Sequence, residues 1–225
     1  LDPDAPTGMY HIELISGERT IKYFYFDVAA YRKPEIDIAM DLEGEEIQAE
    51  DEMIAHIQAD YYFGMPAFNQ DFQWSVSSDD AYFYLPGYQV GPLQMDWFIP
   101  PIWMPTSPFG EHIRSSEGIT DDDGYAQISL AGNELALEDE IEGTTQKITL
   151  EVNFTDESGL RVTHRDSLLR HPEFFYIGVK PESYYGRANT PLDFSILTVD
   201  WDKDPIQDIP VEAIFEAVEL TFEET

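Results

Sequence analysis

Short runs of aromatic and β-branched residues recur along the whole sequence and constrain its fold more than any other feature. Glycine, proline, asparagine and aspartate separate these runs. In residues 53–59 the apolar side chains alternate with polar ones, as in a strand with one buried face. The helix-favouring residues in 48–58 leave a helix there as the alternative. The pattern predicts an all-β chain of antiparallel sandwiches or barrels, with little helix.

The expected strands are the runs that follow this rule, and two glycine turns join some of them. In Asp122-Asp123-Gly124 and Glu157-Ser158-Gly159, glycine stands where a hairpin turn requires a positive φ. The strands are expected at residues 8–15, 20–28, 35–41, 53–61, 71–77, 125–130, 147–155, 161–169, 174–180, 192–199 and 211–222.

The charge of the chain excludes several kinds of partner. Its 225 residues include 45 Asp and Glu against 12 Lys and Arg, a net charge of -33. Because no basic stripe can neutralise a phosphate backbone or an anionic bilayer, nucleic acid and acidic membranes are excluded as partners. The longest apolar runs, such as residues 99–104, are too short for membrane insertion of this segment. The acidity also suggests a salty habitat as a hypothesis.

Two similar segments indicate domain joints. Residues 31–35 and 169–174 each place a basic residue before a proline, an acid and a new apolar run. We therefore expect the end of a preceding β domain at 1–30, a complete sandwich at 31–170 and the start of a following domain at 171–225. The absence of an initiator methionine favours a fragment of a longer protein. A Pro- and aromatic-rich insertion at 79–118 is expected either to cap an open end of the sandwich or to bind a partner.

No constellation of residues indicates catalysis, so we expect no enzyme and no catalytic, cofactor-binding or metal-binding residues. The chain has no cysteine, no Gly-x-Ser-x-Gly elbow and no phosphate-binding loop. Carboxylates are too abundant for any pair to indicate a glycosidase. Asp200–Asp204 resembles the start of a calcium loop, but the sixth position, where that loop needs glycine, is Pro205, followed by Ile206. A looser calcium site there or at Asp121–Asp123 stays an alternative, as does glycosylation at Asn153. The histidines show no metal-ligand spacing; they are His11, His56, His112, His164 and His171.

Several segments, in order, resemble the third macroglobulin-like domain of bacterial alpha-2-macroglobulins and its flanks. The central segment is 59–69 (ADYYFGMPAFN), followed by 72–76 (FQWSV). In it, Tyr61, Phe63 and Trp74 are expected between two sheets, while Gly64 and Pro66 turn the chain and Asn69 opens the next strand. The other similar segments are 26–35 (FDVAAYRKPE), 120–126 (TDDDGYA), 152–159 (VNFTDESG), 171–179 (HPEFFYIGV) and 198–202 (TVDWD).

This resemblance implies tandem macroglobulin-like sandwiches that serve as a non-catalytic scaffold. The family inhibits proteases by entrapment, so proteases and neighbouring macroglobulin-like domains are the implied partners. The implied location is the periplasm or the cell surface, and a lipid anchor upstream is left open. The alternative function is a surface adhesin or carbohydrate-binding module that uses the aromatic insertion, including Trp97 and Trp103. A hydrolase is a third possibility.

Overall fold

A computed structural model gives the structure of the chain and describes residues 8–17, 19–28, 35–91, 110–137, 143–156, 159–183, 185–187 and 189–215. The fold is all-β, as predicted, and the only helical element described is one 3₁₀ turn, η1 (Gly132–Glu134). The described part contains no helix with the length and hydropathy that a membrane span needs.

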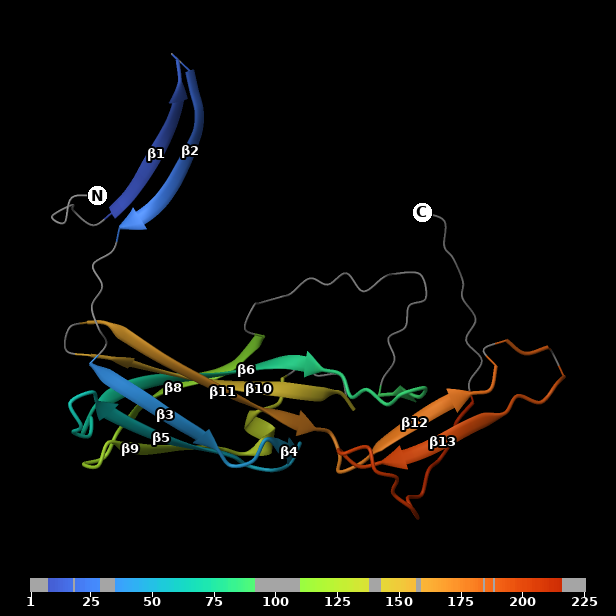
Figure 1. The fold of residues 1–225 in the computed structure, drawn as a ribbon. Coiled ribbons are helices and arrows are strands. Elements are labelled where there is room, and N and C mark those ends of the chain that lie inside the picture. The colour runs from blue at the N-terminus through green and yellow to red at the C-terminus, as the bar shows by residue number, and fades with distance from the viewer. Residues whose placement is uncertain are drawn as a thin grey trace, which may run out of the picture.

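Most of the chain forms a two-layer antiparallel sandwich, which we call the main sandwich (Figure 1). One layer is a five-stranded sheet in the order β4-β11-β10-β6-β8, and the other is a three-stranded sheet in the order β3-β5-β9. Only the β4–β11 pair is parallel. The strands are β3 (Ile36–Leu42), β4 (Glu46–Gln48), β5 (Met53–Tyr61), β6 (Asp71–Ala81), β8 (Glu111–Ile119), β9 (Tyr125–Leu130), β10 (Thr145–Thr155) and β11 (Arg161–His171).

The core lies between these two layers because every second residue of the central strands points inward. Met53, Ile57 and Phe154 are fully buried, and Phe72 stacks on Phe154 with ring centroids 5.0 Å apart. Tyr61 packs against this core and Trp74 lies in it, as predicted. Phe63 does not, because it follows the end of β5 and is 72% exposed. Gly124 and Gly159 have the predicted positive φ, and so does Gly64 in its turn, whereas Asn69 lies in the turn before β6 and does not open the strand.

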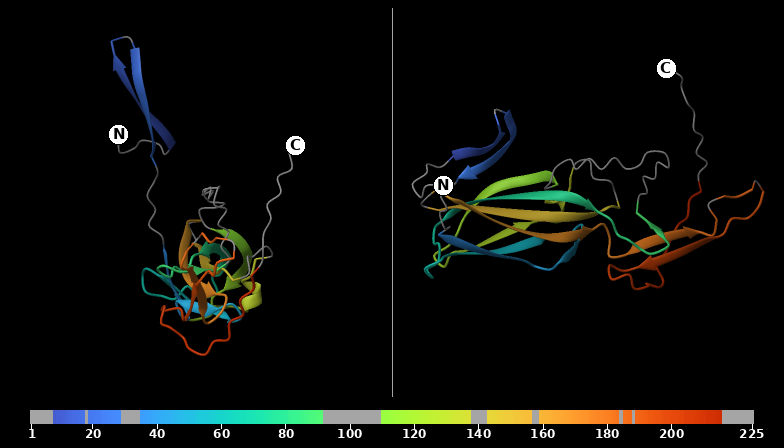
Figure 2. Two further views of the ribbon diagram at one scale, coloured as in Figure 1. Left: turned by 90° about the vertical axis from the view of Figure 1, so that its right-hand side faces the viewer. Right: turned by 45° about the horizontal axis from the view of Figure 1, so that its top comes forward.

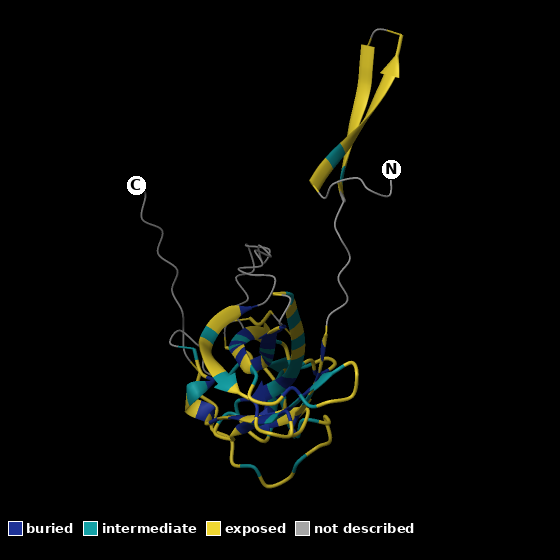
Figure 3. Ribbon diagram, turned by 90° about the vertical axis from the view of Figure 1, so that its left-hand side faces the viewer, coloured by how far each residue is buried: buried dark blue, intermediate teal, exposed yellow. Residues whose placement is uncertain are grey.

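A separate hairpin precedes the main sandwich. Strands β1 (Gly8–Ser16) and β2 (Arg19–Val28) pair along their whole length. The hairpin stands apart from the sandwich in Figures 1 and 2 and is almost entirely exposed (Figure 3). Two strands alone bury too little apolar surface to be stable, so this hairpin needs a covering partner.

A second, smaller sheet follows the main sandwich at its opposite end (Figure 1). It has the order β13-β12-β7, with β12 (Tyr176–Pro181), β13 (Phe194–Val199) and the short β7 (Gln89–Val90). Although β7 belongs to the expected insertion of the main sandwich, it pairs with β12. We call these three strands the second sheet.

Several expectations about single elements were wrong. Strands β4, β7 and β8 were not predicted, and β8 lies within the segment assigned to the insertion. Residues 211–215 form no strand, and 216–222 lie outside the described residues. The described start of the insertion does not cap the main sandwich, since Leu85 is buried in the core of the second sheet. Residues 92–109, which include Trp97 and Trp103, lie outside the described part.

Candidate functional site

The main sandwich and the second sheet meet at His171, the last residue of β11. Only residues 172–175 separate it from Tyr176, the first residue of β12. His171 is 2% exposed and Tyr176 is 5% exposed. Because both residues are buried where one unit passes into the next, their contacts help to determine how the two units are joined. We call this region the joint.

The ring of His171 contacts a different element on each side. Its Nδ1 lies 2.5 Å from the hydroxyl of Tyr176, which also hydrogen-bonds to the hydroxyl of Thr145 at the start of β10. Its Nε2 lies 3.4 Å from Oε1 of Glu46 in β4, without the geometry of a hydrogen bond. The indole of Trp201 stacks on the imidazole with centroids 4.4 Å apart. Residues from both units therefore surround His171.

Burial controls the ionisation of this cluster. It lowers the pKa of His171 below its usual value of 6.5, while the Glu46 carboxylate acts in the opposite direction. Burial also raises the pKa of Tyr176 to about 12. With both groups neutral, the Tyr176 hydroxyl can donate to Nδ1 while the Thr145 hydroxyl donates to Tyr176. Such a cluster positions the strands: the two hydroxyls and Nδ1 of His171 are occupied with one another, while Nε2 faces Glu46 without a hydrogen bond.

A second connection crosses the joint along residues 82–91. Phe83 stacks on Tyr176 with ring centroids 3.8 Å apart, and Val90 pairs with Gly178. A Cβ atom on Gly178 would lie 2.7 Å from Cδ2 of Leu85, so this close approach requires glycine. The ammonium of Lys203 lies 5.8 Å from the centroid of the Phe83 ring. The units are thus linked both by β11–β12 and by the segment from β6 to β7.

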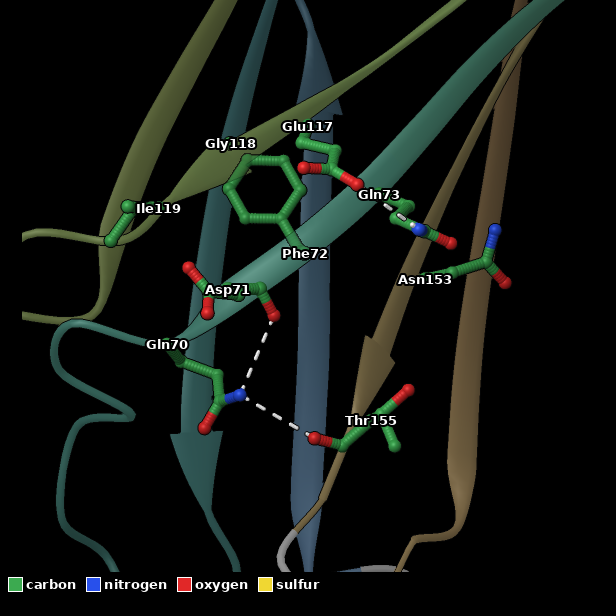
Figure 4. Close-up of a pocket in the computed structure, with 9 residues that line it drawn as sticks. All are labelled: Gln70, Asp71, Phe72, Gln73, Glu117, Gly118, Ile119, Asn153 and Thr155. Atoms are coloured by element: carbon green, nitrogen blue, oxygen red, sulfur yellow. Dashed lines mark hydrogen bonds between the residues drawn. The ribbon is translucent and has the colours of Figure 1, made fainter.

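A groove on the five-stranded sheet offers polar groups but no reactive arrangement (Figure 4). Its volume is about 590 Å³, and Gln70, Gln73, Glu117 and Asn153 contribute to its lining. The Gln70 amide donates to the carbonyls of Asp71 and Thr155, each at 3.4 Å. The Gln73 amide donates to Glu117 at 3.3 Å. These side chains are thus hydrogen-bonded to the backbone or to neighbouring side chains, which is typical of an ordered sheet surface.

The arrangement closest to a catalytic relay lies on the outer face of the three-stranded sheet. His56 Nδ1 is 2.7 Å from the Tyr125 hydroxyl, and Nε2 is 2.7 Å from Oε1 of Glu43. A carboxylate, an imidazole and a hydroxyl in line resemble a triad. However, the alternation of β5 and β9 directs them away from the core, onto an open surface. A cross-strand contact explains the three groups without a reaction.

The acidic turns and the glycosylation motif have structural roles. The Asp121 carboxylate accepts from the backbone N–H groups of Asp123 and Tyr125, and that of Asp200 accepts from Asp204. Among the described residues, no three His, Asp or Glu side chains gather as a metal site would require. Asn153 is 7% exposed, and its amide donates to Glu151 while its carbonyl accepts from Thr163. It is therefore poorly placed for modification.

No family model matches this sequence, and no curated protein matches it. Several solved structures, in contrast, are similar to this chain. The native conformation of Escherichia coli alpha-2-macroglobulin aligns with 91% of this chain at a TM-score of 0.60 and 17% identity. Salmonella alpha-2-macroglobulin reacted with methylamine aligns with 89% at a TM-score of 0.58 and 18% identity. The E. coli protein activated by porcine elastase aligns with 90% of this chain at a TM-score of 0.53 and 18% identity.

The chain has a macroglobulin-like fold. It spans only a small part of these structures: 13% of the native E. coli chain, 13% of the Salmonella chain and 17% of the elastase-activated chain. At this level of identity the likeness shows the fold, which confirms the predicted fold class and the resemblance on which it was based.

The joint of this macroglobulin-like chain was only partly visible in the sequence. The basic-Pro-acid pattern around His171 marked it as a connection, and the structure places that residue there. Sequence analysis missed Thr145, Tyr176 and Phe83, which lie far apart in the chain and meet only through strand pairing. No local pattern could have found them, because each occupies an ordinary inward position of its strand or loop.

Proposed function

We propose that this chain is a non-catalytic scaffold segment of a bacterial alpha-2-macroglobulin-like protein that inhibits proteases by entrapment. The observation that carries the proposal is the alignment of about nine-tenths of the chain, at a TM-score of 0.60, with part of a bacterial alpha-2-macroglobulin. The doubly linked joint supports it, because a scaffold that moves as a whole needs its units mechanically coupled. The proposed location is the periplasm or the outer cell surface, which fractionation of cells would test.

The proposed domain division follows the three β units. Residues 1–30 end a preceding macroglobulin-like domain, 31–170 form a complete one and 171–225 begin the next. The hairpin supports the first part, because its face with Tyr10, Ile12 and Phe24 is a continuous apolar stripe, on which Ile12 and Phe24 are 49% and 60% exposed in the described part of the chain. In this division β7 is a strand that one domain contributes to the sheet of its neighbour.

A substrate-size assay tests entrapment in the protein that contains this chain. Porcine elastase, which activates the E. coli relative, is the first probe. After incubation, we expect elastase to lose activity on a large protein substrate and to keep it on a small chromogenic peptide. Equal loss on both substrates would indicate a blocked active site, and no loss on either would contradict the proposal.

A carbohydrate-binding adhesin is the second candidate, and one observation favours it. Tyr82 and Tyr84 are 83% and 69% exposed at the start of the aromatic insertion, alternating with Phe83 and Leu85. Exposed tyrosine rings can stack on sugars. A glycan array with the chain and with Tyr82→Ala/Tyr84→Ala would test this. Binding that the double substitution abolishes favours the adhesin, whereas no binding by either protein removes it.

A further inference from the structure

Large apolar side chains are concentrated on the loop between β5 and β6, at the end of the main sandwich where the chain enters from the hairpin. We call residues 62–70 the tip loop. Tyr62, Phe63, Met65 and Phe68 are between 52% and 72% exposed. Aromatic residues and methionine are enriched in protein interfaces. Four such residues on one loop indicate a surface that is covered in the working protein.

The tip loop is held firmly, so it presents these side chains in a fixed arrangement. The buried hydroxyl of Thr120 donates to the carbonyl of Ala67 at 2.5 Å and accepts from the backbone N–H of Gln70 at 3.0 Å. The N–H of Tyr61 donates to the carbonyl of Met65 at 2.8 Å. The ring of Phe63 stacks on Tyr61 with centroids 5.0 Å apart. A loop ordered in advance loses little entropy when a partner binds.

The hairpin carries a matching surface on one of its two faces. The β1–β2 register places Met9, His11 and Glu13 on the same face as Tyr23, Tyr25 and Asp27, so two carboxylates flank the aromatic rings. The imidazole of His11 lies 5.6 Å from the Tyr23 ring and 5.9 Å from the Tyr25 ring, centroid to centroid. Tyr25 is 62% exposed and Met9 is 74% exposed. We call this the tyrosine face, and the opposite face carries the continuous apolar stripe.

The chain itself keeps the two surfaces close. β2 ends at Val28, and the carbonyl of Glu35 accepts a hydrogen bond from the N–H of Tyr62 at 2.9 Å, within the tip loop. The connection from residue 28 to residue 35 can span at most about 25 Å. The hairpin lies at this end of the main sandwich (Figure 1). Such a short tether gives an effective concentration of about a millimolar, enough to populate a weak apolar contact.

We propose that the tip loop is the docking surface for the tyrosine face of the β1–β2 hairpin. The contact forms an interface between the unit that contains the hairpin and the main sandwich. The proposal rests on the proposed function in one respect: a preceding domain covers the opposite, apolar face. It commits to this chain's own hairpin, because the tether keeps the hairpin within reach of the tip loop.

Because the chain has no cysteine, paired cysteine substitutions give an unambiguous test. The test pair is Tyr25→Cys with Phe63→Cys in the 225-residue chain. Two pairs serve as controls. In Phe24→Cys with Phe63→Cys, the hairpin thiol lies on the opposite face of the hairpin at almost the same distance along the chain. In Tyr25→Cys with Tyr82→Cys, the second thiol lies beyond the far end of β6. Circular dichroism of the reduced variants checks that each one folds. Disulfide formation under mild oxidation is followed on non-reducing gels.

We expect the test pair to form an intramolecular disulfide at least about tenfold faster than either control pair. The additional substitution Phe68→Ser should slow disulfide formation in the test pair and leave the rates of the control pairs unchanged. Equal rates for the two hairpin faces, or no intramolecular disulfide, would overturn the proposal. An intermolecular disulfide whose yield rises with protein concentration would point to a second copy and would also overturn it. None of these outcomes bears on elastase trapping, so the two proposals fail separately.

Discussion

Gly118 shows how one missing side chain shapes the core. It lies opposite Phe72 in the β6–β8 register, and a Cβ atom there would be 2.4 Å from Cζ of that ring. Gly118→Ala must displace a ring that stacks on Phe154, so we expect the free energy of unfolding to fall by about 1–3 kcal/mol. Urea denaturation measures it. At Gly186 an added Cβ meets nothing within 4 Å, so Gly186→Ala should change stability by less than about 0.5 kcal/mol. Equal losses would contradict this account.

His171 gives the joint a pH dependence of known sign. Burial lowers the pKa of His171 in the folded state from its ordinary value of 6.5. As the pH falls below 6.5, the unfolded chain therefore binds more protons than the folded chain does. The stability that the neutral imidazole contributes is complete above pH 6.5 and is lost as pH falls toward the folded pKa. Against His171→Gln, the native chain should lose stability more steeply between about pH 7 and pH 5. The carboxylates other than Glu46, which faces His171, cancel in this comparison, and parallel curves for the two proteins would contradict the assignment.

The burial of some residues could be predicted from the sequence, and that of others could not. The alternation in β5 correctly predicted the burial of Met53 and Ile57, because an inward position is a local property of a strand. The expectation from the resembling segment that Phe63 lies between the sheets was wrong, because Phe63 follows the end of β5 and is exposed. Burial of His171 could not be predicted, because its neighbours Tyr176 and Trp201 come from later elements.

Among the elements, β7 and the segment before it hold the second sheet to the main sandwich. Leu85 is 6% exposed and packs in the core that includes Tyr176 and Val199. We expect Leu85→Ala to destabilise this core by about 2–5 kcal/mol and to speed hydrogen exchange in β12 and β13. Exchange in β5 and β10 should change little. Tyr84→Ala, at a position 69% exposed, is the matched control. Faster exchange in all strands alike would show that the two units unfold as one.

The elements that sequence analysis missed share a physical cause. β8 is an edge strand whose side chains are mostly exposed, so it shows no apolar alternation. β4 and β7 are three and two residues long, and each is defined by pairing with a strand that comes much later in the chain. Local pattern therefore predicts central strands well, whereas edges and short pairings depend on the assembled fold.

At the scale of the whole molecule, the fold persists where the sequence has diverged. Identity to the similar bacterial structures is 17–18%, yet the TM-scores reach 0.60. Inward positions require only apolar side chains of suitable volume, so many sequences can form the same sandwich. The groove and the His56 cluster contain no arrangement specific to a reaction. The comparisons thus show a macroglobulin-like fold, and the scaffold role is the proposal made from it.

The net charge of -33 leads to a prediction for the molecule as a whole. The described ion pairs include Arg114 with Glu134 and Arg165 with Glu151, but 12 Lys and Arg cannot neutralise 45 acidic residues. The remaining carboxylates repel one another more in the compact state than in the unfolded chain. Raising KCl from about 0.05 M to 1 M shortens the screening length to about 3 Å, which should raise the melting temperature by several degrees. Sucrose at matched osmolality separates screening from preferential exclusion. A melting temperature that is indifferent to KCl would show that charge repulsion does not limit this fold and would remove the basis for a salty habitat.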